Sequence, residues 1–329
     1  MYRILGMGNA LTDVLIQVDS DIILSELGLP KGSMQLIDQP LFLQLQKRIK
    51  ELPKQMACGG SAANTITGVS KMGVKAGFIG TVHQDEVGDN YRNDLLSYGV
   101  APYLLEDSQP SGQSIVFITP DHERTFATYL GAAASMEASM LKPALFDGYD
   151  LFYIEGYLVQ NHELIRTAIR MAKDAGLKVA LDLASYNVVE GNLDFLKELI
   201  QTQVDIVFAN EEEAKSLTGL EPEAALEWMA GQVETAVVKL GKKGAIGKQD
   251  GNVVRMPASS ATRVDTTGAG DLFAAGFLYG VANRKDFSEC LRYGSIAAGK
   301  VIEYVGSKID QTGWDAVMNA FNAIDILVE

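Results

Sequence analysis

A glycine-rich turn, Asp265–Asp271 with the sequence DTTGAGD, carries the residue types of a catalytic site. It leads directly into the apolar run LFAAGFLYGVA, which predicts a helix that begins at Asp271. Amides at a helix start lack partners within the helix and favour negative charge, so Gly268, Ala269 and Gly270 predict an anion hole. The carboxylate of Asp271 can accept a proton from an attacking hydroxyl. An ordinary helix cap has the same appearance, and the turn alone leaves both interpretations open.

Three other segments place polar or glycine residues directly after apolar runs. Asn9 and Asp13 follow RILGM, and an amide and a carboxylate at a strand end can bind vicinal hydroxyls. Asn210 and Glu213 follow DIVFA, but an Asn cap with acids behind it suits any helix start. The turn Lys239–Gly244 follows a further apolar run and is either a ligand-binding turn or a simple hairpin.

The elements that must position these residues alternate between short apolar runs and amphipathic stretches. Strands are predicted over Arg3–Met7, Ala76–Gly80, Leu151–Glu155, Lys178–Leu183, Ile206–Ala209 and Thr235–Leu240. Helices are predicted over Ser61–Met72, Asp89–Ser97, Glu163–Ala175, Leu193–Leu199, Glu211–Leu217 and Pro222–Met229, and then Asp271–Ala282, Phe287–Glu303 and Trp314–Ile324. This alternation predicts an α/β domain with a mostly parallel sheet covered by helices on both faces.

Two stretches interrupt that alternation with short strand-like pieces and polar turns. They are residues 15–38 and 100–130, and neither builds a βαβ unit. We interpret them as a small β lid inserted into an α/β domain made of residues 1–14, 39–99 and 131–329. The alternative is that both are surface excursions.

The composition excludes several classes of partner. A formal net charge of −14 opposes binding to nucleic acid and to anionic membranes. The two cysteines form no disulfide framework, no apolar run reaches the roughly 18 residues of a membrane helix, and the N-terminus lacks a signal-peptide pattern. We therefore expect a cytoplasmic protein.

Two glycine patterns imitate other nucleotide-binding motifs. Gly6 and Gly8 open a dinucleotide fingerprint, but Leu11 stands where its third glycine is required, which weakens an oxidoreductase interpretation. Gly294–Val301 imitates a phosphate-binding loop, but it lies within a helical pattern and ends in Val instead of Ser or Thr.

The chain resembles the ribokinase-like, or PfkB, carbohydrate kinases, which include adenosine kinases. Their signature D-T-x-G-A-G-D matches Asp265–Asp271, and their paired glycines followed by Asn match CGGSAAN at Cys58–Asn64. The resemblance covers essentially the whole chain in the same order. It implies a three-layer α/β/α ribokinase-like fold with a mostly parallel central sheet and a small β-sheet lid. It also implies an ATP-dependent kinase that uses Mg²⁺.

The resemblance assigns roles residue by residue. Asp271 would be the general base, beside the anion hole of Gly268, Ala269 and Gly270. The phosphoryl acceptor would contact Asn9, Asp13, Gly59, Gly60, Asn64 and Arg124, the last of these from the lid. The nucleotide and its magnesium would involve Asn210, Glu213, Lys239, Gly241 and Gly244. A monovalent cation, potassium in several relatives, would lie near Asp265, Thr267 and Gly306.

The acceptor is expected to be a nucleoside or a sugar. The opening GNALTD and the stretch LASYNVV resemble adenosine kinases, which favours adenosine over ribose or fructose. A sugar phosphate is less suited, because only Lys31 and Arg124 offer positive charge near the acceptor motifs. A non-catalytic nucleotide- or sugar-binding relative is the alternative from another class. Lids of this family often pair between subunits, which suggests a homodimer.

Overall fold

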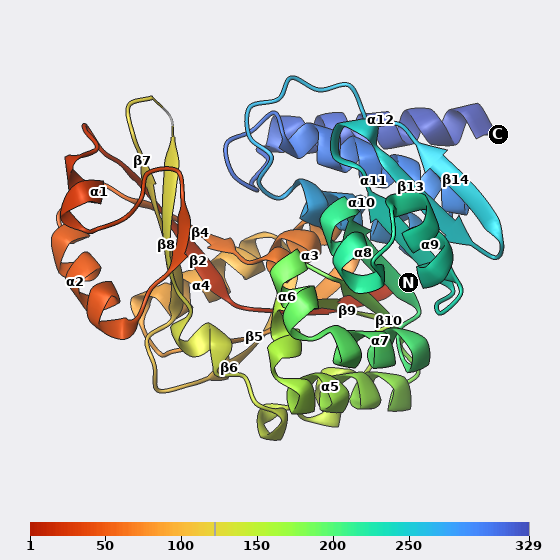
Figure 1. Ribbon diagram of the computed structural model, residues 1–329, viewed down its shortest axis with the longest axis horizontal. Coiled ribbons are helices and arrows are strands. Elements are labelled where there is room, and N and C mark those ends of the chain that lie inside the picture. The colour runs from red at the N-terminus through yellow and green to blue at the C-terminus, as the bar shows by residue number, and fades with distance from the viewer. Residues whose placement is uncertain (122, 329) are drawn as a thin grey trace.

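The computed structural model describes residues 1–121 and 123–328 and contains a nine-stranded sheet in the order β14-β13-β12-β11-β10-β9-β1-β5-β6 (Figure 1). The neighbours from β12 to β6 run parallel, whereas β13 and β14 add an antiparallel edge. The strands are β1 (Arg3–Met7), β5 (Lys75–Val82), β6 (Val100–Glu106), β9 (Leu151–Glu155), β10 (Lys178–Asp182), β11 (Ile206–Asn210), β12 (Thr235–Lys239), β13 (Ala245–Gln249) and β14 (Asn252–Met256).

Helices cover both faces of this sheet because successive strand residues point to opposite sides. Ile4 of β1 joins one core, whereas Leu5 joins the other. The first core lies under α3 (Ser61–Lys71), α4 (Glu86–Ser97), α10 (Ala269–Ala282), α11 (Phe287–Val301) and α12 (Gln311–Val328). The second lies under α5 (His162–Asp174), α6 (Tyr186–Gly191), α7 (Leu193–Thr202), α8 (Glu211–Thr218) and α9 (Pro222–Ala230). The predicted three-layer α/β/α arrangement is therefore confirmed.

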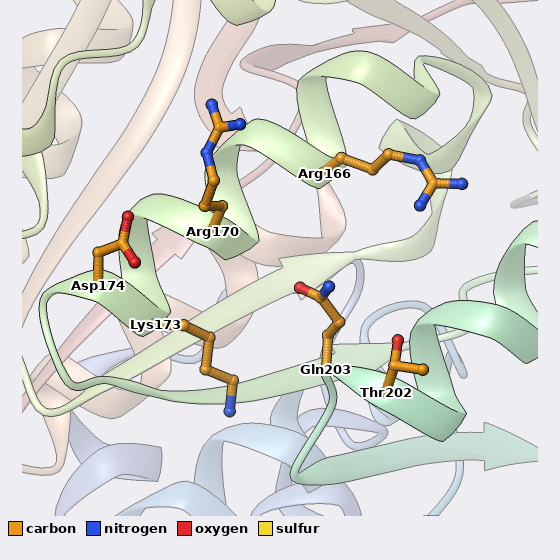
Figure 2. A pocket seen from close by; sticks show the side chains of 6 residues that line it. All are labelled: Arg166, Arg170, Lys173, Asp174, Thr202 and Gln203. Atoms are coloured by element: carbon orange, nitrogen blue, oxygen red, sulfur yellow. The ribbon is translucent and has the colours of Figure 1, made fainter.

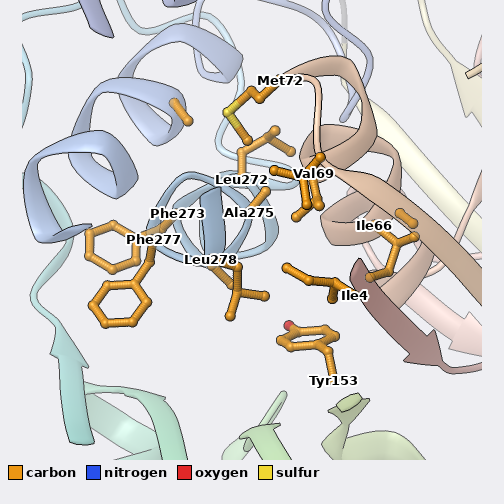
Figure 3. Packing of buried hydrophobic residues seen from close by; sticks show 14 of the residues in the cluster. Ile4, Ile66, Val69, Met72, Tyr153, Leu272, Phe273, Ala275, Phe277 and Leu278 are labelled. Carbon is orange, nitrogen blue, oxygen red and sulfur yellow. The ribbon is translucent and has the colours of Figure 1, made fainter. Parts of the chain in front are cut away.

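Helix α10 lies deep within the first core, as Figure 3 shows. Its residues Leu272 and Leu278 are buried among side chains of α3, β1 and β9, including Ile66, Ile4 and Tyr153. This packing fixes the position of the first turn of α10. Among the described residues, no helix is long and apolar enough to cross a membrane.

A second sheet with the order β3-β8-β7-β2-β4 stands at one side of the main domain (Figure 1). Its strands are β2 (Leu11–Gln17), β3 (Met34–Leu36), β4 (Gln55–Gly59), β7 (Gly112–Ile118) and β8 (Arg124–Tyr129). One face packs on α1 (Ile22–Glu26) and α2 (Gln39–Ile49) around Phe42, Ile115 and Tyr129. We call this second sheet with its two helices the lid. Single 3-10 turns occur at Gly131–Ala134, Ala138–Met140, Pro143–Leu145, Gly156–Gln160 and Gly241–Lys243.

The predicted bounds of the lid, 15–38 and 100–130, require correction at both segments. Strand β6 at Val100–Glu106 pairs in parallel with β5 and completes a βαβ unit of the main sheet. Conversely, the helix and strand between residues 39 and 59 belong to the lid, because α2 packs on its core and β4 pairs with β2. Strand β2 also begins before residue 15, at Leu11.

Candidate active site

The candidate site lies at the carboxyl ends of the parallel strands, where the strand order reverses. From β1 the chain builds β5 and β6 on one side and β9 to β12 on the other, and ligands of open α/β sheets bind outside such a point. The backbone N–H of Asn9, just past β1, donates to Glu155 Oε1 at 2.8 Å. Oε2 of Glu155 accepts from the backbone N–H of Ala62 at 2.7 Å. The buried Glu155 at the end of β9 thus joins three segments at this point.

The carboxylate of Asp271 is held by two side chains of α3. Ser61 Oγ donates to Asp271 Oδ1 at 2.7 Å, and Asn64 Nδ2 donates to Oδ2 at 2.9 Å. Asn64 is itself fixed, because Ser307 Oγ donates to its Oδ1 at 2.9 Å. The structure therefore gives Asn64, predicted to bind the acceptor, the task of orienting Asp271. A carboxylate held in one orientation is pre-organised to receive a proton.

The surroundings of Asp271 adjust its acidity. Burial raises its pKa to about 6, the two hydrogen bonds from α3 lower it, and nearby Asp182 and Lys239 act in opposite directions. Lys239 Nζ lies 2.7 Å from Asp182 Oδ2, at the ends of β12 and β10. A methyl group added at Gly270 would lie 3.2 Å from that ammonium, so the positive charge lies beside the start of α10. Asp271 thus combines a fixed carboxylate with a pKa closer to neutrality than that of a free Asp.

The segment 265–270, which we call the anion loop, ends at the N-terminus of α10. Gly268 precedes the helix with a φ of +77°, in the left-handed region that favours glycine. The N–H of Ala269 donates to the carbonyl of Thr266 at 3.2 Å. Within the described chain, the amides of Gly268 and Gly270 donate to no acceptor. Two of the three predicted amides are thus available to a negatively charged ligand.

Asp13 lies on the lid strand β2, beside the glycine pair. A methyl group at Gly59 would lie 2.6 Å from Asp13 Oδ2, which places this carboxylate directly over the glycine. Burial raises the pKa of Asp13 to about 6, whereas Lys308 and Arg124 lower it and Asp271 raises it. The predicted acceptor-binding carboxylate and the predicted base are therefore electrostatic neighbours.

Arg124 and the predicted cation ligands meet at a single carboxylate, that of Asp265. Arg124 Nη1 lies 2.6 Å from Asp265 Oδ2, and the Gly306 N–H donates to the same oxygen at 2.7 Å. Oδ1 accepts from the backbone N–H of Thr267 at 3.0 Å and from its hydroxyl at 2.9 Å. Every partner of Asp265 here is a donor, and this arrangement does not fit a cation bound to the carboxylate.

Asn210 and Glu213 form a capping box at the start of α8. Glu213 Oε1 and Oε2 accept from the side chain and backbone of Asn210 at 2.6 and 2.7 Å, and Glu213 N donates to Asn210 Oδ1 at 2.8 Å. Burial raises the pKa of Glu213 to about 7, while Lys239 lowers it. A carboxylate has about four acceptor sites, so Glu213, although only 2% exposed, keeps unused acceptor capacity.

The remaining predicted nucleotide residues divide between two places. Gly241 begins a single 3-10 turn between β12 and β13, and Gly244 directly follows that turn. Lys239, by contrast, extends toward Asp182 and the anion loop, as described above. The structure therefore brings Lys239 to the site and leaves the glycine turn at the end of its strand.

Five residues of the site lay outside the predicted set. Ser61 stood within the quoted motif CGGSAAN, and Ser307 directly follows the predicted Gly306. The other three are Glu155, Asp182 and Lys308. Glu155 and Asp182 each end a buried apolar strand, which is a signal for a site residue in a parallel sheet. No local pattern points to Lys308, whose Nζ lies 3.4 Å from Cys58 Sγ.

A cavity of about 490 Å³ lies away from this site, between α5 and the end of α7 (Figure 2). Its lining residues are Arg166, Arg170, Lys173, Asp174, Thr202 and Gln203. Arg166 pairs with Glu198, and Lys173 Nζ lies 2.5 Å from Asp205 Oδ2. Much of the positive charge that lines the cavity is therefore neutralised. It lies toward the amino ends of the strands, where no predicted site residue lies.

Comparisons with known proteins agree with this geometry. A family model described as pfkB family carbohydrate kinase matches residues 46–312. The solved structure of adenosine kinase from Sinorhizobium meliloti is 35% identical, covers 97% of this chain and 99% of its own, and has a TM-score of 0.84. A probable sugar kinase protein from Rhizobium etli CFN 42 is 32% identical, with 97% and 98% coverage and a TM-score of 0.85. Ribokinase of Haemophilus influenzae is 24% identical over 83% of this chain and 90% of that protein.

The matched region contains both predicted signatures, so the predicted family and enzyme class are confirmed. The chain belongs to the pfkB family of carbohydrate kinases and is a phosphotransferase of the kind that acts on sugars or nucleosides.

Proposed function

We propose that the protein transfers the γ-phosphoryl group of ATP to a hydroxyl of a nucleoside, with adenosine favoured, and that Asp271 is the general base. The observation that carries this proposal is the placement of Asp271. Its carboxylate is held by Ser61 and Asn64 in the first turn of the helix that follows the anion loop, and it interacts electrostatically with the carboxylate of Asp13. An attacking hydroxyl needs a proton acceptor on one side and an anion-stabilising group on the other.

The proposed step uses few protein groups. The acceptor oxygen forms a bond to the γ-phosphorus as the bond between that phosphorus and the bridging oxygen of ADP breaks. The hydroxyl proton passes to a carboxylate oxygen of Asp271. Charge that develops on the phosphoryl oxygens is stabilised by the amides of Gly268 and Gly270 and by Lys239, whose ammonium lies beside the loop.

ATP is proposed to carry magnesium into the site. Among the described residues, no cluster of three or more His, Cys, Asp or Glu side chains is arranged to hold a metal ion. Glu213 keeps acceptor capacity for a magnesium-bound water. Lys239 is paired in register with Asn210, so it lies at the same end of the parallel strands. Magnesium would neutralise part of the negative charge of the phosphates. Asn210 would hold Glu213 in place, and Gly241 and Gly244 would contact the nucleotide.

One face of the lid sheet packs on α1 and α2, and we call the opposite face the inner face. The inner face favours a nucleoside over a free sugar. Residues paired in register point to the same side, so Asp13 shares a polar row with Ser114 and Thr128. The next row on that face is mainly apolar, with Leu15, Val116, Phe126 and Met34 in sequence and Gln55 beside Leu15 at one end. Met34 at the end of this row is 63% exposed. A ribose bound by Asp13 would thus lie beside an apolar surface suited to a nucleobase.

A panel of acceptors tests this assignment. With ATP and Mg²⁺, adenosine is expected to give the highest kcat/KM among nucleosides, ribose and fructose, with the phosphorylated product identified by mass spectrometry. Phe126→Ala is expected to raise KM for adenosine by roughly tenfold, because it removes apolar contact with the base. The same variant is expected to leave KM for ATP within about twofold.

The control for that variant is Ile22→Ala, which truncates an exposed apolar residue on α1, away from the inner face. Preferred turnover of ribose or fructose, with Phe126→Ala indistinguishable from wild type, would establish the second candidate, a sugar kinase. Asp13 and its polar row support that candidate. No ATP consumption with any of these acceptors would instead support a non-catalytic binding protein.

The acidity of Asp271 predicts a pH dependence. A general base must be ionised, so kcat/KM is expected to fall as pH drops below about 6, the value to which burial raises the pKa of Asp271. Burial also raises the pKa of Asp13 to about 6. If acceptor binding requires the ionised carboxylate of Asp13, its protonation makes the fall in kcat/KM steeper. The measurement is the pH–rate profile between pH 4.5 and 8 with stability checked at each pH. A flat profile down to pH 4.5 would contradict both roles.

A homodimer through the lid stays a prediction. The edge strand β3 is three residues long, and all three are exposed. Sedimentation velocity would measure the oligomeric state directly.

A further inference from the structure

We propose that the guanidinium of Arg124 takes the place of the monovalent cation predicted at Asp265, and that it couples the order of the anion loop to closure of the lid. Arg124 is thus a positioning residue, and the kinase does not depend on potassium. This inference rests on the proposed function of the anion loop. It is distinct from the assignment of Asp271 as the base.

The acceptor sites of the Asp265 carboxylate are already occupied. Asp265 offers about four acceptor sites, and four donors use them: two from Thr267 on Oδ1, and one each from Gly306 and Arg124 on Oδ2. A potassium ion bound to this carboxylate would have to displace one of these donors. It would also lie close to the guanidinium and be repelled by it.

Burial strengthens the dependence of each partner of this ion pair on the other. The side chains of Arg124 and Asp265 are only 13% and 20% exposed, so the pair is largely removed from water. Removing one partner of a buried charge pair leaves the other charge without compensation, which is costly. The positive charge of Arg124 is therefore fixed at this place, as a bound cation would be.

The two partners of the ion pair come from different parts of the fold. Arg124 begins β8 of the lid, whereas Asp265 begins the anion loop, 141 residues further along the chain. Gly306, the other donor to Oδ2, belongs to the segment that also supplies Ser307 to Asn64. The ion pair therefore connects the lid to the loop and, through Asn64, to the contacts of Asp271.

The second terminal nitrogen of Arg124 can donate to a ligand. Arg124 Nη2 is buried and has no hydrogen-bond acceptor among the described residues. A buried donor without a partner is costly, and a phosphoryl oxygen beside the anion loop would satisfy it. Arg124 can thus hold Asp265 with one nitrogen and a transferred phosphoryl group with the other. A potassium ion could not donate such a hydrogen bond.

The experiment compares wild type with Arg124→Gln and Arg124→Lys in KCl, NaCl and tetramethylammonium chloride at equal ionic strength. Wild-type kcat is expected to change by less than about twofold among the three salts. Arg124→Gln is expected to lose roughly 10- to 100-fold in kcat in tetramethylammonium. Potassium is expected to raise the kcat of this variant about fivefold or more relative to tetramethylammonium. Without potassium, Arg124→Lys is expected to retain more activity than Arg124→Gln.

The matched control is Arg48→Gln, which removes another lid arginine, from an exposed ion pair with Glu26 at 2.9 Å. It is expected to behave as wild type in all three salts. Melting temperatures provide a second readout: potassium is expected to raise that of Arg124→Gln relative to tetramethylammonium and to leave that of wild type unchanged. This readout requires no turnover.

Two results would overturn the inference. One is wild-type turnover that rises tenfold or more in potassium relative to tetramethylammonium, on the order of a true cation requirement. The other is an Arg124→Gln variant with wild-type kcat in every salt. If Arg124→Gln fails to fold, the wild-type salt series and Arg124→Lys still decide the question. Failure of the proposed function has another signature, namely no turnover of any acceptor in any salt.

Discussion

Replacing Asp271 by Asn is expected to lower kcat by roughly 10²–10⁴, which corresponds to about 3 to 5 kcal/mol of lost transition-state stabilisation. The amide has the shape of the carboxylate, so Ser61 and Asn64 can still hold it, but it cannot take up the proton of the acceptor hydroxyl. Because the change affects a step of the reaction, KM for ATP and for the acceptor should change little. Steady-state kinetics and calorimetric titration of both ligands measure the two parts separately.

The control for this variant is Asp286→Asn on the neighbouring helix. Asp286 caps α11 and accepts from the Glu289 N–H at 2.8 Å, and Asn caps helices about as well as Asp. This variant changes the same functional group at a helix start but should keep wild-type kcat. Near-normal turnover of Asp271→Asn, with acceptor binding intact, would show that another group takes the proton.

The core of the fold could be predicted from local sequence patterns. The strands at Arg3–Met7 and Leu151–Glu155 have the predicted bounds, since runs buried on both faces end sharply at polar or turn residues. The helix after the anion loop begins at Ala269, two residues before the predicted start, because its first turn contains the glycine that the pattern assigned to the loop. Local periodicity thus identifies elements well and places their ends less well.

The bounds of the lid could not be predicted in the same way. Strand β6 lies at the edge of the main sheet, where most of its residues are only partly buried, and it contains Pro102. An edge strand with that pattern resembles a lid strand in sequence, because both have one exposed side. Only its parallel pairing with β5 identifies its sheet.

The contacts of the site depend on the topology rather than on local sequence. The resemblance assigned Asn64 to the acceptor, yet its side chain bonds to Asp271, 207 residues away, and to Ser307, 243 residues away. Glu155 was not predicted, because a single acid at the end of an apolar run has no distinctive pattern. Its importance follows from the reversal of strand order, which places it between β1 and the start of α3.

Adding a methyl group at Gly60 is the other change with a large expected effect. Gly60 has a φ of +90°, and an added Cβ would lie 2.3 Å from the backbone carbonyl oxygen of Asn9. That carbonyl cannot retreat easily, because the N–H of Asn9 is bonded to the buried Glu155. Gly60→Ala is therefore expected to lower the free energy of unfolding by about 3 kcal/mol or more, measured by urea denaturation. It should also raise KM for the acceptor more than KM for ATP.

The chain offers a matched control in Gly73, which has the same φ of +90° and no atom within 4 Å of an added Cβ. Gly73→Ala imposes only the cost of a positive φ, about 1–2 kcal/mol, and should leave both KM values unchanged. The difference between the variants measures the collision with Asn9. Equal losses of unfolding free energy in the two variants would show that the collision with Asn9 has no effect on stability. A larger loss at Gly60 would mean that the protein's own backbone requires this glycine, even without a bound acceptor.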